Sequence, residues 1–198
     1  MSVDETGNPG KRTRGNTHYV LAGCAVTDRR MFERAISKYG SSKEIKFYEN
    51  PNLRTKVILD ALPAVDGVFY CAFNKRKGGW DGSGDKEQLH LDLLGALAEG
   101  IAKEYPGYSV EAVVDHNPIS KDRTIERTVA YAFDKYDVSA SVTVNDSSAD
   151  YGLQTNDFFV GSIGEWLNRP RTSRFNPLRN VDLFADRLVE CYRGVQRA

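Results

Sequence analysis

The sequence predicts an α/β fold in which one mixed sheet carries helices on both faces. Three strand-like segments come first, and the second half of the chain then alternates helix, strand, helix, strand and helix. This alternation implies right-handed crossovers and parallel strand pairing in that half. A chain of 198 residues, 40% of them hydrophobic, can fill one core. We therefore expect residues 1–198 to form a single domain.

The strands are predicted from short apolar runs that are rich in β-branched and aromatic residues. Residues 18–26 (HYVLAGCAV) form such a run, and a short strand at residues 2–5 is expected to pair with it as a hairpin. The other predicted strands are residues 67–75, 110–117 and 138–146.

The helices are predicted where apolar residues recur every three or four positions between capping signals. The clearest begins after Asp85 and runs to about Tyr105 with leucines at a spacing of four. The others are expected at residues 27–40, 51–60, 120–136, 153–168 and 181–192. The helices at 27–40 and 51–60 form an insert between the second and third strands.

The charge balance excludes a strong global field, because 27 basic and 27 acidic residues cancel. Binding to a polyanion would therefore need local patches. The three cysteines, Cys24, Cys71 and Cys191, are odd in number and widely spaced, which argues against a disulfide framework and for a reducing compartment. The sequence shows no basic and apolar leader and no apolar stretch of membrane-spanning length. We expect a cytoplasmic protein with no membrane contact, and the oligomeric state stays open.

Acidic residues follow several predicted elements at positions that could share one site. Asp4 ends the first strand and Asp115 ends the fourth, while Asp157 lies early in the helix that contains LQTND. Glu44 stands in SSKEIKF, with Lys46 two residues on. Ligands of open α/β sheets bind at the carboxyl ends of strands, and clustered carboxylates suit Mg²⁺ or Mn²⁺. The sequence thus predicts a divalent-metal site.

Each acid also has an ordinary structural explanation when it is taken singly. Asp4 precedes a Gly-Asn-Pro-Gly turn and could be a turn residue, and Asp115 could merely end a strand. Asp157 could be a surface acid that the helix dipole stabilises near the start of its helix. The argument for a site is that all of them fall where one site could form. Glu5 is expected to point to the opposite face from Asp4, because neighbouring strand residues alternate.

The motifs, taken in order, resemble the large prokaryotic domain-of-unknown-function family 3800 (DUF3800). That family begins with Asp-Glu-Ser-Gly, carries Glu-x-Lys after the second strand, ends a middle strand in Asp and closes with Leu-Gln-x-x-Asp. The matching segments here are VDETGNPG, KEIKF, VVDHN and LQTND, spread over almost the whole chain. Thr6 replaces the usual serine and keeps its hydroxyl.

The resemblance implies a ribonuclease H-like mixed five-stranded sheet of order 3-2-1-4-5, with helices on both faces. It also implies an acidic cluster of Asp4, Glu44, Asp115 and Asp157, with Gln154 and Lys46 as polar neighbours. Ribonuclease H-like nucleases hold two divalent ions about 4 Å apart, which activate water and steady the leaving oxygen. The expected activity is therefore that of a metal-dependent nuclease or phosphodiesterase that acts on nucleic acid.

Several alternatives stay open at this point. The helix after the third strand offers other acids in place of Glu44, namely Glu87, Asp92 and Glu99. The fold could instead serve as a non-catalytic nucleic-acid or protein-binding module with a vestigial or structural ion site. A glycosidase-type acid pair is a third possibility. Basic clusters could hold a nucleic-acid backbone, or could be solvated loops. They are Lys11, Arg12 and Arg14; Lys75, Arg76 and Lys77, with Trp80 nearby; and Arg169, Arg171 and Arg174.

Overall fold

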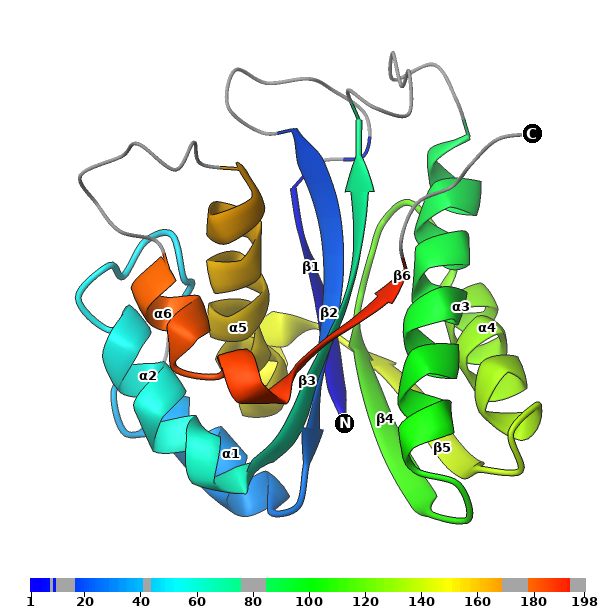
Figure 1. Ribbon diagram of the computed structural model, residues 1–198, viewed down its shortest axis with the longest axis horizontal. Coiled ribbons are helices and arrows are strands. Elements are labelled where there is room, and N and C mark those ends of the chain that lie inside the picture. Colours follow the sequence, from blue (N-terminus) through cyan, green and yellow to red (C-terminus); the bar gives the residue numbers. More distant parts are fainter. Residues whose placement is uncertain (8, 10–16, 41–43, 76–84, 169–177, 193–198) are drawn as a thin grey trace.

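A six-stranded sheet forms the centre of the computed structural model (Figure 1), which describes the chain apart from residues 8, 10–16, 41–43, 76–84, 169–177 and 193–198. The strands are β1 (Ser2–Thr6), β2 (His18–Val26), β3 (Val65–Asn74), β4 (Ser109–Asp115), β5 (Ser139–Asn145) and β6 (Leu188–Tyr192). The helices are α1 (Arg29–Ser37), α2 (Arg54–Ala61), α3 (Lys86–Glu104), α4 (Asp122–Asp134), α5 (Tyr151–Asn168) and α6 (Leu178–Asp182). Short 3₁₀ turns lie at η1 (Leu62–Ala64), η2 (Ser147–Ala149) and η3 (Ala185–Arg187).

The central strand of the sheet is β1. It pairs antiparallel with β2, which confirms the predicted hairpin, and it pairs in parallel with β4. β4 in turn pairs in parallel with β5, so the predicted parallel half of the sheet is confirmed. As a result, the carboxyl ends of β1 and β4 lie at the same end of the sheet.

The predicted five-stranded sheet is wrong in strand number. Its five strands lie side by side in the predicted order 3-2-1-4-5, but a sixth strand, β6, pairs with β3 and extends the sheet. The observed order is β5-β4-β1-β2-β3-β6. A helix was expected over residues 181–192, but α6 ends at Asp182 and residues Leu188–Tyr192 pair in parallel with β3. The backbone groups along the edge of β3 need partners, and this tertiary demand outweighs the local helical pattern.

Two helical layers cover the sheet (Figure 1), one on each face as predicted. α3 and α4 pack on one face, over a core that includes Val3, Phe69 and Leu97. α1, α2, α5 and α6 pack on the other, over a core that includes Val20 and Phe158. Because strand side chains alternate, β2 and β3 contribute to both cores. None of the helices in the described ranges is long and apolar enough to span a lipid bilayer.

Two helices begin at side-chain caps close to their predicted starts. Asp85 caps α3 by accepting the Gln88 amide, and Asp28 caps α1 by accepting the Met31 amide. α2 differs, because it begins at Arg54 and not at Pro51. The Leu53 amide donates to the Asn50 carbonyl, so Pro51 belongs to a turn that precedes the helix.

Candidate functional site

The candidate site begins at the end of β1, where Asp4 is buried between the sheet and α5. Val3 belongs to the core under α3, so the next residue points to the opposite face. Asp4 is 7% exposed, and its Oδ1 accepts the Glu5 amide at 2.6 Å. Burial raises the pKa of Asp4 well above its usual value, and the carboxylate of Asp157 on α5 raises it further.

Asp115 ends β4 at the same end of the sheet. Its Oδ1 accepts the backbone amide of Ser147 in η2 at 2.9 Å. Burial raises the pKa of Asp115 to about 6, against the lowering effect of that hydrogen bond, and the nearby Asp146 and Glu44 carboxylates add to the rise. The first turn after β5 therefore fixes the acid that ends β4.

α5 holds the segment of the insert that carries Glu44 and Lys46, which are also predicted site residues. Gln154 Oε1 accepts the Ile45 amide at 3.3 Å, and Asp157 Oδ2 accepts the Phe47 amide at 2.7 Å. Residues three apart share one face of a helix, so Gln154 and Asp157 can take alternate amides of an extended segment. Burial also raises the pKa of Asp157.

Gln154 makes one further contact, which joins two parts of the site. Its Nε2 donates to the Ser147 carbonyl at 2.9 Å, so one buried side chain connects η2 with the segment at Ile45. This explains the glutamine of LQTND as a positioning group.

Glu44 reaches the same cluster, although it comes from the insert between β2 and β3. Its Oε1 accepts the Ser147 hydroxyl at 2.7 Å, and its Oε2 lies 3.3 Å from Lys46 Nζ. The Glu44 carboxylate also raises the pKa values of Asp115 and Asp157. Lys46 is 53% exposed, so it pairs with Glu44 while its ammonium still faces solvent.

The alternative acids on α3 are engaged elsewhere. Asp92 accepts a hydrogen bond from Gln88 on its own helix, and Glu99 forms an ion pair with Lys135 at 3.0 Å. Glu87 accepts the Ser120 hydroxyl at 2.8 Å. In this structure Glu44 therefore takes the place that the α3 acids could have filled.

Close packing against α5 sets the position of the Glu44–Lys46 segment. The ring of Phe47 is fully buried against Gly161, where an added Cβ would lie 2.5 Å from the ring. The ring of Tyr48 is 57% exposed, and its hydroxyl lies 3.2 Å from Thr6 Oγ1. The Thr6 hydroxyl thus contacts the hydroxyl of an exposed tyrosine that borders the site.

Glu5 belongs to the acidic cluster, although sequence reasoning set it aside. It contacts Asn117 as expected for the α3 side of the sheet, since its Oε1 accepts Asn117 Nδ2 at 2.8 Å. Burial nevertheless raises the pKa of Glu5 to about 8, and the Asp115 and Asp157 carboxylates contribute to the rise. Its position at the end of β1 could have identified Glu5 from the sequence, because side chains on both faces of the sheet come close to the end of β4 there.

The chemistry of this cluster fits a divalent cation. The raised pKa values of Asp4, Glu5 and Asp115 show that several carboxylates share a buried region whose negative charge is not fully neutralised. Hard carboxylate oxygens are the ligands that Mg²⁺ and Mn²⁺ prefer. As the side chains are placed, however, no three acidic, histidine or cysteine groups of the described residues are grouped so as to hold one ion. The donors fit in type and charge, but as placed they do not form a closed ion site of three such groups among the described residues.

The basic clusters contribute little to the described surface. Only Lys75 of those nine basic residues has a described side chain, and it is buried instead of forming a surface patch. The remaining eight, and Trp80, lie outside the described residues.

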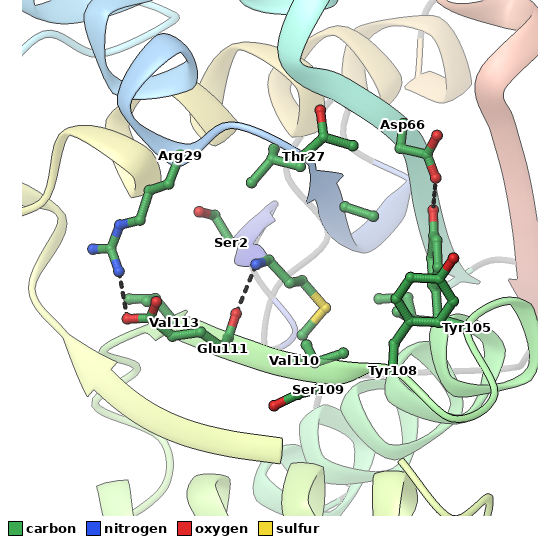
Figure 2. A pocket seen from close by; sticks show the side chains of 14 residues that line it. Ser2, Thr27, Arg29, Asp66, Tyr105, Tyr108, Ser109, Val110, Glu111 and Val113 are labelled. Carbon is green, nitrogen blue, oxygen red and sulfur yellow. Dashed lines mark hydrogen bonds and ion pairs between the residues drawn. The ribbon is translucent and has the colours of Figure 1, made fainter. Parts of the chain in front are cut away.

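A separate pocket lies at the opposite end of the central strands. It has a volume of about 490 Å³ and is lined by the starts of β1 and β4 (Figure 2). Arg29 pairs there with Glu111 at 2.6 Å, and Tyr105 donates to Asp66 at 2.6 Å. Its polar groups therefore already bind one another, and none of the predicted site residues lines it.

Comparison with known proteins supports the fold. No family model matches the chain, and no curated protein matches it. Among solved structures, the chain is similar to RNase HII of Archaeoglobus fulgidus, determined in complex with PCNA. The match has a TM-score of 0.56 at 14% sequence identity, and it covers 84% of this chain and 73% of that one. This likeness shows a ribonuclease H-like α/β fold.

Proposed function

We propose that this protein is a divalent-metal-dependent nuclease or phosphodiesterase, and that it belongs to the DUF3800 family. The observation that carries the proposal is the convergence of acids from β1, β4, α5 and the insert on one end of the sheet. The pKa values of Asp4, Asp115 and Asp157 rise through burial and through repulsion by neighbouring carboxylates, as expected where a cation would neutralise them. The ribonuclease H-like fold supports the same assignment by analogy.

The residues that would hold Mg²⁺ or Mn²⁺ are Asp4, Glu44, Asp115 and Asp157, and Glu5 stands close enough to contribute. A bound divalent ion would lower the pKa of a water molecule and stabilise charge on a phosphate oxygen. The chain's own task is to present these carboxylates and to neutralise part of their charge.

Positioning groups set the carboxylates in place. Ser147 holds Asp115 and Glu44 through its amide and its hydroxyl, and Gln154 holds Ser147 in turn. Lys46 is one described cation at the rim, and its half-exposed side chain could contact a substrate phosphate. The exposed ring of Tyr48 offers a face on which a base could stack.

A non-catalytic nucleic-acid or protein-binding module remains the second candidate. The observation that favours it is the spacing of the acids, since no three of the described ligand-type side chains group around one point. In that case the acids would hold a structural ion or none at all.

Calorimetry with Mn²⁺ and Mg²⁺ tests the metal site directly. The wild-type protein should bind Mn²⁺, and Asp4→Asn and Asp115→Asn should each weaken binding at least about tenfold. Asp134→Asn is the matched control, because Asp134 is exposed at the end of α4 and should leave binding unchanged. Equal Mn²⁺ binding by all four proteins would overturn the assignment of the site.

A cleavage screen then separates the two functions. RNA–DNA hybrid, single-stranded RNA and DNA would each be incubated with the wild-type protein and Mn²⁺. Cleavage that disappears in Asp115→Asn but persists in Asp134→Asn supports the nuclease. Metal binding without cleavage of any substrate favours the binding module.

A further inference from the structure

The sixth strand brings two cysteines together at the edge of the sheet. Tyr70 of β3 pairs with Glu190 of β6, but the next residue, Cys71, pairs with Tyr192. Cys191 is therefore the extra residue of a bulge, and it lies beside Cys71. Neighbouring strands are about 4.8 Å apart, which falls within the range of Cα separations that a disulfide spans.

Both side chains face the same helix. Cys71 belongs to the core under α3, and Cys191 packs against that core from the edge. Gly100 of α3 makes room for this contact, because a Cβ at that position would clash with Cys191 Sγ. A thiol contact between β3 and β6 is thus built into the packing of α3.

The two thiols differ in access and in acidity. Cys71 is completely buried, whereas Cys191 is partly exposed and lines a surface hollow of about 410 Å³ with Gly95 and Lys103 of α3. The proximity of the two sulfurs lowers the pKa of the Cys191 thiol and raises the pKa of the Cys71 thiol. An accessible thiol with a lowered pKa beside a buried partner is the arrangement found in peroxide-sensing pairs.

We infer that Cys191 and Cys71 form a redox modification site, in which a hydroperoxide oxidises Cys191 and Cys71 closes a reversible disulfide. This site is separate from the acidic cluster and does not depend on the function proposed for that cluster. The bond would tie the edge strand β6 to β3.

The chemistry balances in two steps. The Cys191 thiolate attacks one oxygen of hydrogen peroxide, the O–O bond breaks, and the products are Cys191 sulfenic acid and hydroxide. The Cys71 sulfur then attacks the Cys191 sulfur and its proton leaves with the departing hydroxyl group as water. In sum, two thiols and one peroxide give one disulfide and two waters.

Thiol counting on the full-length chain tests this inference. The reduced protein would be treated with hydrogen peroxide at a small molar excess, denatured and alkylated with N-ethylmaleimide. We expect the number of free thiols to fall from three to one, the remaining thiol to be Cys24, and dithiothreitol to restore all three. Peptide mapping should recover a Cys71–Cys191 cross-link within one chain.

Matched variants separate the pair from general oxidation. Cys24→Ser should still form the cross-link, because Cys24 lies in the core on the other face of the sheet. Cys71→Ser should instead accumulate a Cys191 sulfenic acid that dimedone traps. If Cys71→Ser does not fold, the wild-type thiol count still decides. Three free thiols after peroxide treatment, or cross-links only between chains, would overturn the inference.

Discussion

Asp157 Oδ2 accepts the backbone amide of Phe47 at 2.7 Å, so an acid of α5 fixes a segment that lies 110 residues earlier in the chain. This one contact joins the insert between β2 and β3 to the carboxylates at the end of β1. It gives Asp157 two separable roles, because its charge acts on the acidic cluster while its oxygen holds the backbone.

Two substitutions at Asp157 should separate these roles. Asp157→Asn keeps an oxygen for the Phe47 amide, so the free energy of unfolding should change little while metal-dependent cleavage falls about 100-fold or more. Asp157→Ala leaves that amide without its acceptor and should also destabilise the fold by about 1–3 kcal/mol. Urea unfolding and cleavage rates measure the two effects. Equal loss of stability in both variants would argue against the holding role.

The contact between Gly161 and Phe47 should be intolerant of a methyl group. Gly161→Ala places a Cβ 2.5 Å from the buried ring and should destabilise the protein by about 1–3 kcal/mol. Gly95→Ala on α3 is the control, because its Cβ meets Thr128 at an ordinary 3.6 Å. There the better helix propensity of alanine should leave stability unchanged or raise it by up to about 1 kcal/mol. Thermal unfolding of the two variants compares them.

The metal-free protein should lose stability as the pH rises. Burial raises the pKa of Glu5 from 4.5 to about 8 and that of Asp115 from 3.8 to about 6. At pH values between the usual pKa of each group and its raised pKa in the folded protein, the folded state keeps a proton that the unfolded state has lost. The free energy of unfolding therefore falls as the pH rises. The expected slope is about 1 kcal/mol per pH unit, ending near pH 8.

Unfolding in EDTA between pH 5.5 and 8.5 measures this slope. Glu5→Gln cannot titrate, so its curve should be flatter between pH 6 and 8 than that of the wild type. A wild-type stability that is constant or rises over this range would contradict the raised pKa values.

Lys46 should contribute to substrate binding through its charge. Lys46→Met should weaken binding of a nucleic-acid substrate several-fold. It should also reduce the slope of log K against the logarithm of the salt concentration by about one, which corresponds to the loss of one phosphate contact. Lys56→Met on the exposed side of α2 should leave both quantities unchanged. Fluorescence anisotropy at several salt concentrations measures them. The same salt slope for wild type and Lys46→Met would remove Lys46 from the proposed interface.

Several features of the fold were predictable because they depend on local signals. The β1–β2 hairpin, the parallel β4–β5 pair and the cap of α3 at Asp85 follow from apolar periodicity, turn residues and capping chemistry. The alternation of β1 side chains also places Asp4 and Glu5 on opposite faces. These patterns repeat within a few residues, so the sequence alone contains them.

β6 was missed for a tertiary reason. Residues Leu188–Tyr192 form a strand because the edge of β3 offers hydrogen-bond partners, and no local pattern reveals that edge. The contact between Cys71 and Cys191 depends on the same pairing. The sequence shows these cysteines only as distant residues.

By itself the sequence determined which acids stand at the ends of strands, and so the chemistry that the site can offer. Only the tertiary structure decided that Glu44 reaches Ser147, that Glu5 shares the field of Asp115, and that no three of the described acids group around one ion as they stand. The reason is physical: residue type and strand position are local properties. The distance and burial that set a carboxylate's pKa arise from segments brought together by folding.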